Sequence, residues 1–138
     1  MEKNCGNDRA DETLMRKPAV PGLARFVNAL GYSIRGFRAV WRHEAAFRLE
    51  LILAVILLPA AFFIAESVYF LLSMIASLFL VIICELFNSA IETIVDRIGH
   101  ENHILSGQAK DIGSAAVLTS IILALVTWGV VLYARFAS

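Results

Sequence analysis

The sequence predicts an all-α membrane protein with three transmembrane helices and an N-terminal amphipathic interfacial helix. Of its 138 residues, 59% are hydrophobic and only 17% are charged, whereas soluble domains are roughly 45–50% hydrophobic. The hydrophobic residues gather in three long runs, and a helix of about 20 such residues crosses a hydrocarbon layer of ~30 Å. A single membrane-embedded unit therefore accounts for most of the chain.

The segment before the first apolar run divides into a tail and an amphipathic helix. Residues 1–21 are mostly polar and lack the apolar core of a signal peptide, so we expect a flexible tail there. Over about 23–42, apolar residues recur at steps of three and four, with Arg35, Arg38 and Arg42 on the opposite side. This pattern predicts a helix on the membrane surface, with its arginines at anionic headgroups. A helix that only anchors the chain is the simpler alternative.

Three apolar segments follow, at about 48–65, 67–96 and 110–135, so that residues 22–138 form the membrane-embedded domain. Each segment can span a bilayer, although the first is short and contains Pro59. Lysine and arginine are concentrated before the first segment, and the short connection after it has neither. The positive-inside rule therefore predicts a cytoplasmic N-terminus.

The second apolar segment carries a line of polar residues. Because successive residues of an α-helix turn by roughly 100°, one face is shared by Glu85, Asn88, Glu92 and Asp96. A charged side chain at the bilayer centre costs between about 2.5 and more than 10 kcal/mol, so an intramembrane carboxylate indicates a functional site by default. The predicted topology places this line near the cytoplasmic interface.

Ionisable residues of the neighbouring segments are expected at the same depth, namely Glu44, Lys110 and Asp111. Magnesium is held by one or two carboxylates together with substrate phosphates, and Glu44 and Glu92 suit that role. Desolvation makes the deeper Glu85 a stronger base, able to accept a proton from a lipid hydroxyl. Lys110 supplies positive charge for phosphate oxygens, and Asp111 orients Lys110 or a metal-bound water.

Two other interpretations of the polar line stay open from the residues alone. Polar side chains can fix an oligomer by hydrogen bonds between packed helices, at an average of about 0.6 kcal/mol each. Aligned carboxylates also form relays, so a small proton- or cation-conducting membrane protein is an alternative. The chain contains no Gly-x-x-x-x-Gly-Lys-Ser/Thr loop, so we do not expect phosphate binding by a backbone cradle.

Five motifs stand at or near these residues. They are Gly31-Tyr32-Ser33, Glu44-Ala45-Ala46-Phe47-Arg48, Glu85-x-x-Asn88-Ser89-Ala90-Ile91-Glu92, Val95-Asp96-Arg97 and Lys110-Asp111-x-Gly113-Ser114-Ala115-Ala116-Val117. Together they resemble the small prokaryotic diacylglycerol kinase family over about residues 22–136. The resemblance implies transfer of the γ-phosphate of magnesium ATP to diacylglycerol. It also implies a homotrimer with active sites between subunits, in the cytoplasmic (inner) membrane of a bacterium.

The resemblance further implies roles for individual residues. Glu85 is the expected catalytic base, supported by Asn88, and Glu44 and Glu92 are the expected magnesium ligands. The expected ATP-binding positions are Arg25, Tyr32, Glu44, Glu92, Glu101, Asn102, His103, Lys110 and Asp111. The expected lipid substrate positions are Arg25, Ala29, Leu30, Ser33, Arg38, Trp41, Ala46, Phe47, Glu50, Glu85, Ser114 and Trp128.

A related activity is the phosphorylation of undecaprenol by another branch of the same family. The stretch from Glu44 to Arg48, preceded by Trp41, resembles the diacylglycerol branch more closely, as does the full third apolar segment. Undecaprenol kinase therefore remains the alternative within the family.

Overall fold

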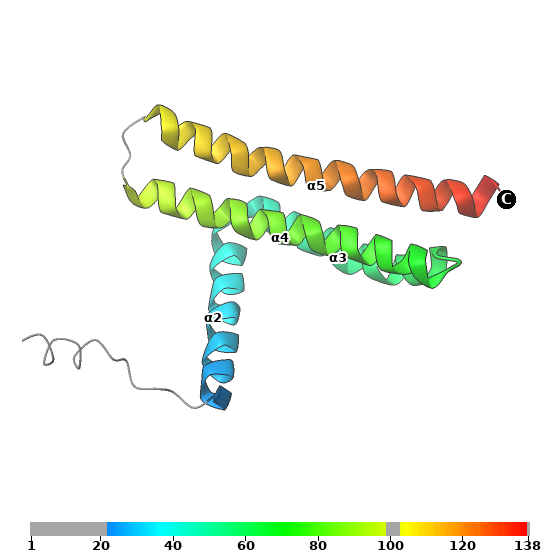
Figure 1. Ribbon diagram of the computed structural model, residues 1–138, viewed down its shortest axis with the longest axis horizontal. Coiled ribbons are helices and arrows are strands. Elements are labelled where there is room, and N and C mark those ends of the chain that lie inside the picture. Colours follow the sequence, from blue (N-terminus) through cyan, green and yellow to red (C-terminus); the bar gives the residue numbers. More distant parts are fainter. Residues whose placement is uncertain (1–21, 99–102, 138) are drawn as a thin grey trace, which may run out of the picture. The chain divides into compact units, whose positions relative to one another are not determined.

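The computed structural model describes residues 22–98 and 103–137 (Figure 1). The tail at 1–21 and the predicted nucleotide positions Glu101 and Asn102 lie outside the described residues. The helices are α2 (Gly22–His43), α3 (Ala45–Ile64), α4 (Val68–Ile98) and α5 (Ile104–Ala137). Because the described residues contain no strand, the predicted all-α class is confirmed.

Three of these helices, α3, α4 and α5, are long and apolar enough to cross a membrane. At a rise of about 1.5 Å per residue, even α3 with its 20 residues matches the hydrocarbon thickness. The helices α4 and α5, of 31 and 34 residues, are longer than the hydrocarbon layer requires. The prediction of three transmembrane helices is confirmed.

The helix α5 begins at Ile104, several residues before the apolar run that predicted it. Its first turn is stabilised locally, because the ring Nδ1 of His103 accepts a hydrogen bond from the Leu105 backbone N–H over 3.2 Å. The Gly107 N–H donates to the His103 carbonyl over 3.1 Å. The His103 ring thus satisfies the Leu105 N–H, a donor that a helix N-terminus leaves free, and its carbonyl accepts the first i→i−4 bond of α5.

The core lies along α4, which packs on α5 and, less extensively, on α3 (Figure 1). Buried residues recur on α4 at steps of three and four: Met74, Ser77, Leu78, Val81, Ile82, Glu85 and Ser89. Serine permits close approach because its hydroxyl bonds to its own helix, as Ser77 Oγ does to the Met74 carbonyl over 2.8 Å. Most other apolar side chains of these helices are exposed, as expected for surfaces that face lipid or another membrane helix.

Residues 22–37 belong to a unit separate from residues 38–137. They form the greater part of α2, a strongly amphipathic helix with no buried residue. Its exposed apolar residues include Leu23, Phe26, Val27, Leu30 and Ile34. The predicted amphipathic helix is therefore confirmed, and its uncovered apolar face suits a membrane surface.

Candidate active site

Acidic side chains from three parts of the 38–137 unit interact with one another. Glu85 on α4 is only 3% exposed, and its carboxylate feels the negative charges of Glu44 and Glu92. Glu50 on α3 in turn feels the charge of Glu85. Among residues 22–98 and 103–137, none of these four carboxylates forms a salt bridge. Since like charges repel, these carboxylates are electrostatically coupled, although no group of three or more His, Cys, Asp or Glu in the described ranges is placed to hold a metal ion by itself.

Glu92 is oriented by its neighbour on the polar face of α4. The Asn88 Nδ2 donates a hydrogen bond to Glu92 Oε1 over 3.2 Å, one helical turn apart. The Asn88 Oδ1 is buried and has no hydrogen-bond partner among the described residues. The structure therefore brings the predicted catalytic amide and the predicted metal ligand into direct contact.

Glu44 is the single residue between α2 and α3. Its backbone is extended, with φ −107° and ψ 115°, and its side chain makes no capping hydrogen bond. Its N–H donates to the Val40 carbonyl over 2.8 Å. Arg48, one turn into α3, donates to the carbonyls of Trp41 at 3.1 Å and Arg42 at 3.4 Å. The guanidinium thus satisfies free carbonyls at the end of α2, next to Glu44.

Lys110 lies near the same end of the helices, but its partner differs from the one suggested by the sequence. The Nζ of Lys110 on α5 is 2.6 Å from Asp96 Oδ1 on α4, and it also feels the charge of Glu92. Asp111 is exposed and is in no salt bridge with a described residue. Adjacent helical residues point roughly 100° apart, so Asp96, across the helix pair, is better placed than Asp111 to contact Lys110.

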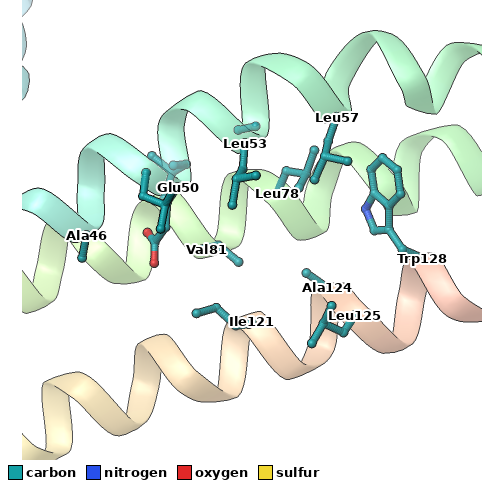
Figure 2. A pocket seen from close by; sticks show the side chains of 13 residues that line it. Ala46, Glu50, Leu53, Leu57, Leu78, Val81, Ile121, Ala124, Leu125 and Trp128 are labelled. Atoms are coloured by element: carbon teal, nitrogen blue, oxygen red, sulfur yellow. The ribbon is translucent and has the colours of Figure 1, made fainter.

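An apolar cavity of about 410 Å³ opens between α3, α4 and α5. Figure 2 shows Glu50 towards one end and Trp128 towards the other, with aliphatic side chains between them. Glu50 Oε2 and Trp128 Nε1 are both buried without a described hydrogen-bond partner. An acceptor and a donor inside an apolar cavity are typical of a site for a largely apolar ligand with a few polar groups.

The cavity approaches the acidic cluster through α4. Val81 and Ile82 line it, and they precede Glu85 by one helical turn. The predicted lipid position Ala46 also lines it. The sequence did not single out its aliphatic wall, because Val81, Ile82 and Ala124 resemble any other apolar residue of a transmembrane helix.

The remaining lipid positions predicted in the 38–137 unit lie outside this cavity lining. Arg38, Trp41 and Ser114 are exposed on their helices. Phe47 is completely buried and contributes to the packing of the chain itself. The structure therefore brings Ala46, Glu50 and Trp128 together, and does not bring Ser114 or Phe47 to the same surface.

The predicted positions in the 22–37 unit are all exposed: Arg25, Ala29, Leu30, Tyr32 and Ser33. The Arg35 guanidinium lies 4.8 Å from the centre of the Tyr32 ring, a cation–π distance. The Ser33 hydroxyl donates to the Ala29 carbonyl over 3.1 Å. Tyr32 and Ser33 therefore have partners on α2 itself.

The acidic cluster and the cavity fall inside a region shared with known proteins. The family model described as prokaryotic diacylglycerol kinase matches residues 31–132. The chain belongs to the prokaryotic diacylglycerol kinase family. Glu44, Glu50, Glu85 and Glu92 lie within the matched region, whereas Arg25 precedes it.

Individual members of the family are similar over nearly their whole length. The diacylglycerol kinase of Escherichia coli K12 is 47% identical over 115 residues, which cover 83% of this chain and 94% of that protein. The diacylglycerol kinase of Pseudomonas aeruginosa is 49% identical over 111 residues, covering 80% and 90%. That of Haemophilus influenzae is 46% identical over 112 residues, covering 81% and 95%. With three helices of membrane-spanning length, these relatives indicate a bacterial membrane protein.

Proposed function

We propose that the protein is an ATP-dependent diacylglycerol kinase that forms phosphatidic acid at the cytoplasmic membrane interface, in lipid recycling and phospholipid metabolism. The observation that carries the proposal is the buried carboxylate of Glu85, which lies one helical turn from Val81 and Ile82 in the lining of an apolar cavity. A lipid that places its apolar part in this cavity can present a hydroxyl to Glu85. The names of the similar proteins support diacylglycerol as that lipid.

The reaction is a phosphoryl transfer with one proton transfer. The free hydroxyl oxygen of diacylglycerol forms a bond to the γ-phosphorus of ATP. The bond from that phosphorus to the oxygen bridging the β-phosphate breaks, and its electron pair leaves with ADP. Glu85 accepts the hydroxyl proton as general base. Asn88, one turn further along α4, is the supporting residue.

Glu44 and Glu92 are the proposed protein ligands of magnesium, which one or two carboxylates together with substrate phosphates can hold. Both side chains offer carboxylate oxygens, neither is in a salt bridge with a described residue, and both repel the nearby Glu85. When bound, magnesium neutralises negative charge on the phosphate oxygens. Lys110, close enough to Glu92 for that carboxylate's charge to act on it, adds positive charge for the nucleotide, and Asp111 is a further proposed ATP position. Arg25, Tyr32, Glu101, Asn102 and His103 complete the proposed ATP positions.

We infer a homotrimer with shared active sites in the inner membrane. The exposed apolar faces of α3, α4 and α5 support contact with other copies or with lipid. The excess of lysine and arginine before the first transmembrane helix supports a cytoplasmic N-terminus. The catalytic domain then comprises residues 22–138, with residues 1–21 as a tail without an assigned role.

The proposal is tested by offering two lipids to the purified protein in mixed micelles with magnesium ATP. We expect radioactive phosphate from the γ-position of ATP to appear in phosphatidic acid when diacylglycerol is supplied. Labelled undecaprenyl phosphate alone would assign the protein to the other branch of the family. Ion flux in vesicles without lipid-dependent ATP consumption would instead favour a conducting protein.

A further inference from the structure

Gly113 lies against the side chain of Asn88 where α5 packs on α4. It is one of the few buried residues of α5. A Cβ atom at position 113 would overlap Asn88 Oδ1, and it would lie 3.4 Å from Asn88 Cγ and 3.6 Å from Asn88 Cα. No glycine of the described chain has a positive φ, so close approach, rather than backbone conformation, accounts for glycine here.

The space beside Gly113 determines which way the Asn88 carboxamide faces. The Glu92 carboxylate accepts hydrogen bonds and has none to donate when ionised, so Asn88 must turn its Nδ2 towards Glu92. Its Oδ1 then points the opposite way, towards Gly113. Because the carboxamide is a rigid planar group, displacing Oδ1 also displaces Nδ2 from Glu92.

We propose that Gly113 is a positioning residue, which permits the Asn88 orientation that fixes Glu92 as a metal ligand. This inference rests on the proposed function, since it concerns the metal site of the same reaction. Residues that orient metal ligands typically change metal affinity when they are replaced. Gly113 reaches the metal site through two contacts: its own with Asn88, and the hydrogen bond from Asn88 to Glu92.

The contact predicts that replacement of Gly113 weakens metal binding at Glu92 and leaves the fold intact. The atom that overlaps an added Cβ is the end of a side chain, and Asn88 Cα stays at an ordinary contact distance. Rotation of the carboxamide therefore relieves the overlap without separating α4 from α5. That rotation breaks the 3.2 Å hydrogen bond from Asn88 to Glu92.

The test measures binding of Mn²⁺, as a substitute for Mg²⁺, to the purified full chain with a non-hydrolysable ATP analogue. Electron paramagnetic resonance of free Mn²⁺ gives the affinity, and a thermal scan reports folding. The variants are Gly113→Ala, Asn88→Ala, the double variant and Glu92→Gln. Gly129→Ala is the matched control, since Gly129 is on the same helix and a Cβ there meets nothing within 4 Å.

We expect Gly113→Ala to weaken Mn²⁺ binding roughly tenfold, with a thermal midpoint close to that of Gly129→Ala. The double variant should bind Mn²⁺ as Asn88→Ala does, because without the carboxamide the added methyl has nothing to displace. Wild-type affinity in Gly113→Ala, while Asn88→Ala and Glu92→Gln are impaired, would overturn the inference alone. So would a misfolded Gly113→Ala, or a double variant weaker than Asn88→Ala. Wild-type affinity in Asn88→Ala and Glu92→Gln would overturn the proposed metal site as well.

Discussion

Lys110 Nζ lies 2.6 Å from Asp96 Oδ1, which joins the beginning of α5 to the end of α4. The pair lies beside the acidic cluster, because Lys110 also feels the charge of Glu92. A partly exposed lysine in this position can exchange its carboxylate partner for a phosphate oxygen. Its contact with Asp96 thus holds positive charge next to the proposed metal ligands when no nucleotide is bound.

Lys110→Ala is expected to raise the KM for ATP by roughly tenfold or more, since it removes a charged donor to phosphate. Asp96→Asn should change this KM much less, because it leaves the ammonium in place. Steady-state kinetics with varied ATP and saturating diacylglycerol checks both values. Equal effects of the two substitutions would show that the ion pair itself, rather than the lysine charge, supports the site.

Arg135→Ala serves as the matched comparison at the other end of the helices. Arg135 Nη1 is also 2.6 Å from a carboxylate, that of Glu66 in the connection between α3 and α4. Because both side chains are partly exposed, we expect the substitution to lower the free energy of unfolding by less than about 1 kcal/mol. The KM for ATP should not change. A higher KM in Arg135→Ala would mean that global packing, rather than local charge, explains any effect at Lys110.

Glu44→Gln and Glu92→Gln should each raise the magnesium concentration required for half-maximal activity, by about tenfold or more. A glutamine retains the size of glutamate and removes one negative charge, so folding should be preserved. Activity measured against magnesium concentration, with the total ionic strength held constant, gives this value. An unchanged magnesium response in both variants would contradict the assignment of these residues as metal ligands.

Ala124→Leu is expected to raise the KM for diacylglycerol, because Ala124 lines the cavity and a larger side chain there occupies space for an acyl chain. The effect should be smaller for diacylglycerol with shorter chains. Ala116→Leu on the same helix is the control, since Ala116 is exposed and does not line the cavity. Equal KM values for the two variants would argue against the cavity as the lipid site.

The sequence predicted those features that depend on periodicity and composition. The three apolar runs predicted the transmembrane helices, and the spacing of Glu85, Asn88 and Glu92 placed them on one face of α4. The burial of Glu85 and the hydrogen bond from Asn88 to Glu92 follow from that spacing combined with the packing of α4 against its neighbours. The resemblance named Glu50 and Trp128 as lipid positions, and the structure places both on one cavity.

Contacts between helices could not be predicted in the same way. The sequence placed Asp96 on the polar line, but only the packing of α4 against α5 shows that it pairs with Lys110. Likewise, the sequence placed Gly113 in a motif but gave it no role, whereas the structure shows its contact with Asn88. The start of α5 at Ile104 depended on a local cap by the His103 ring, which hydropathy does not register.

The most direct test of the account compares the wild type with Glu85→Gln in transfer of labelled γ-phosphate from magnesium ATP to diacylglycerol. Without a general base, the variant should lose at least roughly 100-fold in kcat. It should still bind the nucleotide and unfold at a similar temperature. Phosphatidic acid formed by the wild type and lost in this folded variant would support Glu85 as the base. Near wild-type turnover in Glu85→Gln would contradict the central claim.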